Sequence, residues 1–124
     1  MINPKIMIVE DEIIIAVSLR RKLVNAGYKV CELVDTGEKA IEGMKEEEPD
    51  IILMDILLKG VMNGIEAARE IRAIRNIPII FMTGYESERT MQKAKTVKPA
   101  GCLIKPVSWE TLKASVDMVI QRRE

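Results

Sequence analysis

The feature that most constrains this chain is a regular alternation of short apolar runs with longer segments of helical periodicity. Three unbroken apolar runs, at 6–9, 51–54 and 79–82, have the length and continuity of parallel strands that are covered on both faces. Two weaker runs, at 30–34 and 102–104, are interrupted or short, which is typical of strands nearer a sheet edge. We therefore predict five strands, with the three strong runs in the middle of a parallel sheet.

The predicted helices are recognised by the residues at their ends. Gly27 stops the first helix, which covers about 12–26. An Asp or Asn with a Glu three residues later opens the second and third helices, and each of these helices breaks before a proline. The cap pairs are Asp35 with Glu38 and Asn63 with Glu66, and the prolines are Pro49 and Pro78. A weaker helix covers about 86–96, and the last begins at Ser108.

Five strand-helix units in succession predict the fold class. Parallel strands joined by helices use right-handed crossovers, and five units fall short of the roughly eight that close a barrel. We expect an α/β fold with a single doubly wound five-stranded parallel sheet in the order 2-1-3-4-5, of the flavodoxin-like type. The 124 residues contain no linker, repeat or low-complexity segment, so we expect one domain over 1–124.

Composition excludes several classes of function. The chain has no histidine, which removes Ser-His-Asp and Cys-His nucleophile systems and His-ligated zinc or haem. Its 19 basic and 19 acidic residues balance, with no basic block, so direct nucleic-acid binding is not expected. The apolar stretch near the N-terminus is too short for a signal peptide or a membrane span. Cys31 and Cys102 have no metal-type spacing and fall on opposite sheet edges, so we expect free thiols and a reducing cytoplasmic setting.

Polar residues follow four of the five predicted strands. They are Glu10, Asp11 and Glu12 after the first, Asp55 after the third, Thr83 and Gly84 after the fourth, and Lys105 and Pro106 after the fifth. Each is ordinary alone, as a helix-start acid, a cap or a solvated side chain. The carboxyl ends of parallel strands share one edge of the sheet, so we expect the side chains that follow these strands to lie close together. Crowded carboxylates need a cation, and oxygen ligands without His or thiolate favour Mg²⁺.

A carboxylate beside a metal ion can attack phosphorus and form an aspartyl phosphate. Asp55 is the candidate nucleophile, and Lys105 is the ammonium that would neutralise the phosphoryl oxygens. The order of these motifs resembles the receiver domain of two-component response regulators, over essentially the whole chain. The resemblance rests on Glu10-Asp11, on Asp55 at the end of its strand, on Thr83-Gly84 and on Lys105-Pro106.

The resemblance implies a role for each of these residues. Asp55 would accept a phosphoryl group from a phosphohistidine on a partner sensor histidine kinase. Mg²⁺ would be held by Glu10, Asp11 and Asp55 together with the backbone carbonyl of Leu57. Thr83 would hydrogen-bond the phosphoryl group, Lys105 would pair with it, and the Lys105-Pro106 bond would be cis.

The resemblance also implies a signalling protein, not an enzyme with a substrate of its own. The domain would catalyse its own phosphorylation and dephosphorylation and thereby switch contacts with a downstream effector protein or domain. The face formed by the fourth helix, the fifth strand and the last helix is where such a domain would form a homodimer.

Two positions depart from the usual pattern of receivers. Three residues before Lys105, where receivers commonly carry Tyr or Phe, this chain has Cys102. In receivers this ring swings inward when the threonine moves toward the phosphoryl group. The resemblance therefore does not extend to that relay, which leads to the face of the fourth helix, the fifth strand and the last helix. Tyr85 is either a substitute ring or an ordinary surface residue. Glu10 replaces the more common Asp, a change of one methylene that a contact through water tolerates.

Two features beside the site have two interpretations each. The loop at 57–64 carries apolar side chains, which either contact a partner or pack under the next helix. Gly84 either leaves room for the phosphoryl group or is a turn glycine.

Three other functions fit parts of the pattern. A haloacid-dehalogenase-type hydrolase also forms an aspartyl phosphate, but it needs Asp-x-Asp after the first strand, where Asp11 is followed by Glu12 and Ile13. A flavodoxin-like carrier needs a hydroxyl-rich phosphate loop at that position, and neither Gly-x-Gly-x-x-Gly nor Gly-Lys-Ser/Thr is present. The alternative that stays open is a receiver-like module that acts through protein contacts without phosphorylation. The presence of Asp55, Thr83 and Lys105 argues against it.

Overall fold

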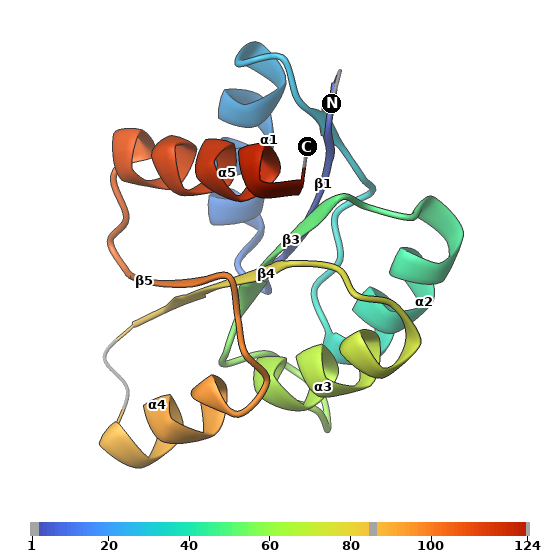
Figure 1. Cartoon of the computed structure of the whole chain (residues 1–124), viewed down its shortest axis with the longest axis vertical. Coiled ribbons are helices and arrows are strands. Elements are labelled where there is room, and N and C mark those ends of the chain that lie inside the picture. The colour runs from blue at the N-terminus through green and yellow to red at the C-terminus, as the bar shows by residue number, and fades with distance from the viewer. Residues whose placement is uncertain (1–2, 85–86, 124) are drawn as a thin grey trace.

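The computed structural model describes residues 3–84 and 87–123, and within them it confirms the predicted α/β fold (Figure 1). The sheet is parallel, with the strand order β2-β1-β3-β4-β5. The three strands predicted for the middle lie there: β1 (Lys5–Val9), β3 (Ile51–Asp55) and β4 (Ile79–Thr83). The edges are β2 (Lys29–Val30) and β5 (Gly101–Ile104).

Helices cover both faces of the sheet, as Figure 1 shows. One face carries α1 (Ile13–Asn25) and α5 (Trp109–Arg123). The other carries α2 (Gly37–Glu47), α3 (Gly64–Ile74) and α4 (Glu88–Lys95).

The two apolar layers follow from the alternation of side chains along each strand. In β1, Met7 and Val9 belong to the cluster under α2, α3 and α4, whereas Ile6 and Ile8 belong to the cluster under α1 and α5. All four are fully buried. Continuous apolar runs are therefore the sequence pattern of strands with a helical layer on each side.

Most helix ends agree with the predictions. Gly27, with φ of 101°, follows α1 in the left-handed conformation expected of a stop. A capping box opens α3, in which the Glu66 N–H donates to Asn63 Oδ1 and the Asn63 N–H donates to Glu66 Oε1, both at 2.9 Å. Ser108 Oγ accepts the N–H of Thr111 at 3.1 Å at the start of α5.

The predicted cap of the second helix was wrong. Thr36, and not Asp35, is the N-cap of α2, since Thr36 Oγ1 accepts the N–H of Lys39 at 3.1 Å. Asp35 instead pairs with the Lys39 ammonium at 3.1 Å. A hydroxyl caps a helix about as well as a carboxylate, so adjacent Asp and Thr residues do not specify which of the two does so.

Three other boundaries differ from the prediction. The second strand is shorter than 30–34: Cys31 N–H still donates to the Ile6 carbonyl at 2.9 Å, but the chain pairs with β1 again only at Val34. Ala26 caps α1 and is exposed. The fourth helix begins after Ser87, and residues 85–86, including Tyr85, lie outside the described residues.

Both cysteines are free, as predicted. Cys31 follows the edge strand β2 and Cys102 lies in the opposite edge strand β5. Burial raises the pKa of the Cys31 thiol to about 12. At neutral pH this thiol is protonated and behaves as a small apolar residue.

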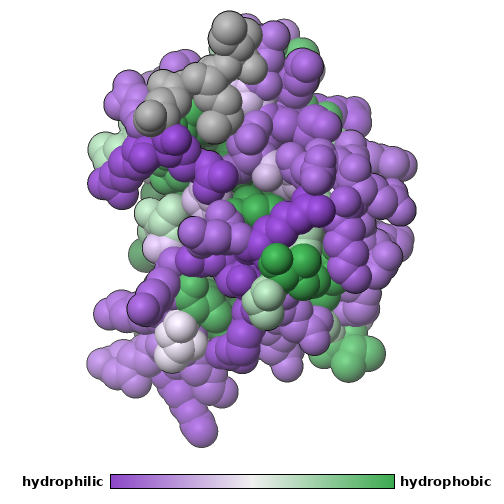
Figure 2. Space-filling model, turned by 45° about the vertical axis from the view of Figure 1, so that its right-hand side comes forward, coloured by the Kyte–Doolittle hydropathy of each residue, from purple (hydrophilic) through white to green (hydrophobic). Residues whose placement is uncertain are grey.

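The surface on the side of α2 and α3 is largely hydrophilic, and its hydrophobic residues form separate small areas (Figure 2). Within residues 3–84 and 87–123, none of the helices combines the length and the apolar character that crossing a membrane requires.

Candidate functional site

Three acidic side chains meet at the carboxyl ends of β1 and β3. The register pairs Val9 with Met54, so the residues that follow, Glu10 and Asp55, lie side by side. One carboxylate oxygen of each of Glu10, Asp11 and Asp55 lies within 4.8 Å of the other two. Glu10 is 2% exposed and Asp55 is 6% exposed. Because burial strengthens repulsion between like charges, this arrangement requires positive charge nearby.

Lys105 supplies part of that positive charge. Its Nζ lies 2.7 Å from Glu10 Oε1 and 3.0 Å from Asp55 Oδ2. Burial alone would lower the pKa of this ammonium, but the hydrogen bonds and charges of Glu10 and Asp55 outweigh that effect and raise the pKa above its ordinary value. Lys105 is therefore charged throughout the physiological range. Its backbone N–H donates to the Thr83 carbonyl at 2.6 Å, and the Lys105-Pro106 bond is cis, as expected.

The remaining oxygens of the two buried acids are tied to the loops that follow their own strands. Glu10 Oε2 accepts the backbone N–H of Glu12 at 3.1 Å. Asp55 Oδ1 accepts the N–H of Leu57 at 3.3 Å. These contacts fix both carboxylates before any ligand arrives, while Asp11 is half-buried.

The cluster has the charge and the donor atoms of a site for a divalent cation. Three carboxylates facing one ammonium leave two negative charges uncompensated. The side chains that converge offer hard oxygen ligands, which Mg²⁺ prefers. The residues present therefore fit the ion that the sequence predicts.

Thr83 lies at the same edge, on the next strand. Asp55 pairs with Met82, so Thr83 is one residue further along β4, and it is 1% exposed. A Cβ added at Gly84 would meet no heavy atom within 4 Å. The protein itself therefore does not require a glycine there.

Gly64 is a neighbour of the site that the sequence did not identify. A Cβ on this first residue of α3 would overlap the carbonyl oxygen of Asp55 and lie 2.9 Å from Ile56 Cα. The Gly64 N–H also donates to the Ile56 carbonyl at 2.8 Å. The start of α3 thus rests directly on the backbone that carries Asp55.

Part of the loop at 57–64 packs under the next helix, as one of its two interpretations predicted, and part of it is exposed. Leu58 and Met62 are partly buried against the core under α2 and α3. Leu57, two residues after Asp55, is 62% exposed, and Val61 is 98% exposed.

A parallel sheet of order 2-1-3-4-5 defines a flavodoxin-like domain, and here acidic residues and a lysine cluster at the carboxyl edge, where such sheets bind their ligands. Residues 6–117 match the sequence model of the response regulator receiver domain, and the chain belongs to this family of two-component signalling modules.

Solved structures agree with this assignment. The signal receiver domain of a modulated diguanylate cyclase from Desulfovibrio desulfuricans G20 is 42% identical, with a TM-score of 0.90 over 96% of this chain and 94% of that one. The chemotaxis protein CheY4 of Vibrio cholerae is 30% identical, with a TM-score of 0.85 over 94% of this chain and 98% of that one.

Curated relatives are longer proteins. The transcriptional regulatory protein YdfI of Bacillus subtilis (strain 168) is 32% identical over 94% of this chain and 55% of its own length. PdtaR of Mycobacterium tuberculosis (strain CDC 1551 / Oshkosh), also a transcriptional regulatory protein, is 28% identical over 95% of this chain and 57% of its own length. The chain therefore spans about half the length of these relatives.

Proposed function

We propose that residues 1–124 form one receiver domain in which Asp55 accepts a phosphoryl group, in a Mg²⁺-dependent transfer from a phosphohistidine of a partner sensor histidine kinase. The observation that carries this proposal is the contact of Lys105 with Asp55 and Glu10 inside a cluster of three carboxylates. One carboxylate would be enough to pair with the Lys105 ammonium in a purely structural ion pair. This cluster has three carboxylates, so its negative charge exceeds the positive charge of Lys105.

The chemistry assigns a task to each side chain. A carboxylate oxygen of Asp55 attacks phosphorus while the bond from phosphorus to the imidazole nitrogen breaks, and the electron pair stays on the imidazole. Lys105, already 3.0 Å from Asp55, neutralises a phosphoryl oxygen, and the Thr83 hydroxyl donates a hydrogen bond to another. The remaining charge neutralisation would come from Mg²⁺, which would be held by Glu10, Asp11, Asp55 and the Leu57 carbonyl.

An apolar groove beside Lys105 supports the proposal of a partner kinase. This groove, of about 510 Å³, lies between α1 and the loop that leads into α5, and it includes Ile14, Leu19 and Val107. Ile14 is 82% exposed. These 124 residues contain no histidine, so a phosphohistidine donor must lie outside them, and this groove adjoins the site that such a donor must reach.

The surface for an effector or a homodimer is proposed on the face of α4, β5 and α5. Ile104 on β5 is 67% exposed and Met118 on α5 is 52% exposed. β5 is also an edge strand, so this face has both apolar side chains and an unpaired strand edge to offer.

Magnesium binding gives the first test. Titration calorimetry with Mg²⁺ is expected to show one site in the wild type, and Asp11→Asn is expected to weaken it by about tenfold or more because a ligand is lost. Asp117→Asn removes the same charge from a residue on α5 that pairs with Lys113, and it should leave the affinity unchanged. Equal affinities in the wild type and Asp11→Asn would contradict the assigned ligand set.

The response to phosphorylation is expected to be local, because Cys102 replaces the usual ring. Cys102 pairs with the buried Phe81 and packs partly buried against the same core, where a small thiol cannot fill space vacated by Thr83. Amide chemical shifts with a beryllofluoride mimic should change at the loop after β4 and little through β5 and α5. Cys102→Tyr should extend the changes. Large changes through β5 and α5 in the wild type, no larger in Cys102→Tyr, would contradict this prediction.

A further inference from the structure

A small pocket at the amino-terminal edge of the sheet is lined by four cations and by no acidic residue. It has a volume of about 190 Å³ and is formed by the end of α3, the segments before β4 and β5, and the end of α5. The cations are Arg72, Lys98, Arg122 and Arg123. Pro78 and Ala100, which also line it, precede β4 and β5, so the pocket lies at the opposite edge from Asp55.

All three guanidinium groups of the pocket donate to neutral acceptors, and Arg122 donates to Met118 Sδ at 3.5 Å. Arg72 donates to the carbonyls of Val97 at 3.2 Å and Lys98 at 3.0 Å, and to Asn76 Oδ1 at 3.2 Å. Arg123 donates to the Asn76 carbonyl at 3.2 Å. Carbonyl oxygens orient these groups but do not cancel their charge.

The four cations also have no acidic partner among the residues that the structure describes. Within 3–84 and 87–123, none of them has a carboxylate oxygen within 4.0 Å. The neighbouring cation Arg75 shows the contrast, because it pairs with Glu48 at 3.1 Å. The pocket therefore concentrates positive charge in a chain whose net charge is zero.

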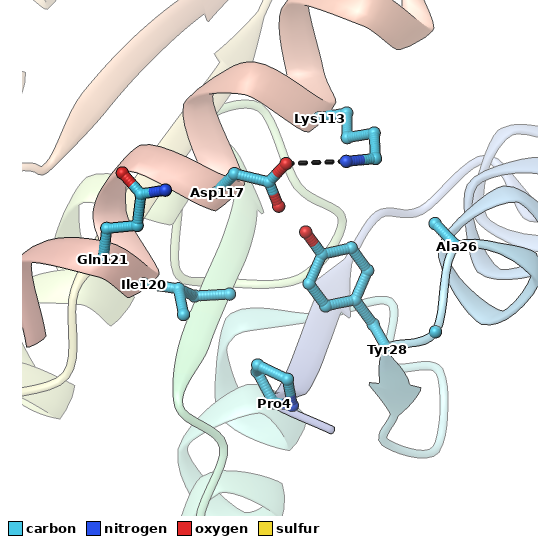
Figure 3. Close-up of a pocket in the computed structure, with 8 residues that line it drawn as sticks. Pro4, Ala26, Tyr28, Lys113, Asp117, Ile120 and Gln121 are labelled. Carbon is cyan, nitrogen blue, oxygen red and sulfur yellow. Dashed lines mark hydrogen bonds and ion pairs between the residues drawn. The ribbon is translucent and has the colours of Figure 1, made fainter. Parts of the chain in front are cut away.

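A second pocket that adjoins α5 differs in this respect (Figure 3). It has a volume of about 360 Å³, and its lining includes Tyr28, Lys113 and Asp117. Lys113 Nζ lies 2.7 Å from Asp117 Oδ2, so the charges in this pocket neutralise each other. Of these two pockets, only the first has a net positive charge on its lining residues.

We propose that the pocket lined by the four cations binds the phosphate groups of a small anion of the diphosphate class. Its volume equals roughly six water molecules, which suits two linked tetrahedral groups, with the rest of the ligand outside. Carboxylates bring one charge each, so a space this small cannot hold enough of them to balance four cations. A phosphate group carries more negative charge than a carboxylate of similar size, and guanidinium groups bind it through paired hydrogen bonds.

Binding is tested with inorganic pyrophosphate in metal-free buffer at about physiological ionic strength, where exposed charges are screened. Calorimetry should show one site, and amide shifts should change at 76, 97–101 and 119–123 and not at Asp55. Arg122→Ala and Arg123→Ala should each weaken binding about tenfold, because each removes a charge-assisted hydrogen bond. Arg20→Ala, which removes an exposed arginine of α1, is the matched control and should bind as the wild type does.

Four results would overturn the proposal. They are absence of pyrophosphate binding at millimolar concentration, equal weakening by Arg20→Ala, an equally tight complex with a polyglutamate peptide, and capture by phosphatidic acid vesicles that pyrophosphate does not displace. Phosphorylation by acetyl phosphate should be unchanged in Arg122→Ala, so this test and the test of Asp55 fail independently. The unfolding curves of the arginine variants should match that of the wild type. Weaker binding then reflects the lost side chain and not a loss of folding.

Discussion

Asp55→Asn is expected to abolish the labile phosphoryl adduct that the wild-type domain forms with acetyl phosphate and Mg²⁺. The side-chain amide keeps the shape of Asp55 and an acceptor for Lys105, but it removes the anionic oxygen that attacks phosphorus. Loss of the attacking group should lower the rate of adduct formation by about a thousandfold or more. Intact-mass measurement with and without the donor reports the adduct directly.

The matched control for Asp55→Asn is Asp35→Asn. Asp35 lies near Glu10 and Asp11 but pairs with Lys39 and is not in the acidic cluster. Asp35→Asn should therefore form the adduct as the wild type does. An Asp55→Asn protein that gains the adduct at comparable yield would remove Asp55 from its role. A wild type that never gains it would favour the receiver-like module that acts through contacts alone.

Gly64→Ala should destabilise the domain by about 3 kcal/mol or more. The new Cβ would overlap the carbonyl oxygen of Asp55, and it would lie 2.9 Å from Ile56 Cα. Both neighbours are backbone atoms of a buried strand and its continuation, so they cannot rotate away as a side chain would. The start of α3 must shift instead, and Asp55 is expected to shift with it. Urea unfolding measures the stability, and the rate of adduct formation measures the displacement.

Gly84→Ala is the control for Gly64→Ala. It adds the same methyl group beside the same site, but no heavy atom lies within 4 Å of the new Cβ. The free energy of unfolding should change by no more than about 0.5 kcal/mol. If Gly64→Ala proved as stable as Gly84→Ala, the close contact of α3 with the β3 backbone would be wrong.

The parts of this fold that could be predicted are those in which a residue pattern specifies burial. Uninterrupted apolar runs placed β1, β3 and β4 in the middle of the sheet, because only strands covered on both faces are apolar at every position. The gathering of Glu10, Asp11, Asp55 and Lys105 followed from topology, since residues at the carboxyl ends of neighbouring parallel strands share one edge.

The parts that were missed depend on local backbone angles or on contacts between distant segments. The choice between Asp35 and Thr36 as a cap depends on local backbone angles that either residue accepts. The contact of Gly64 with Asp55 depends on how the intervening loop returns. The direct bond from Lys105 to Glu10 depends on side-chain reach across the sheet edge, and the basic pocket draws on three separate segments.

Locating the bound phosphoryl group tests directly whether Asp55 is its acceptor. The wild-type domain is incubated with acetyl phosphate and Mg²⁺, the acyl phosphate is trapped by borohydride reduction, and the modified residue is located by peptide mapping. We expect modification at Asp55, dependent on Mg²⁺ and lost when the ion is chelated. Modification at any other residue, or none in the presence of Mg²⁺, would contradict it.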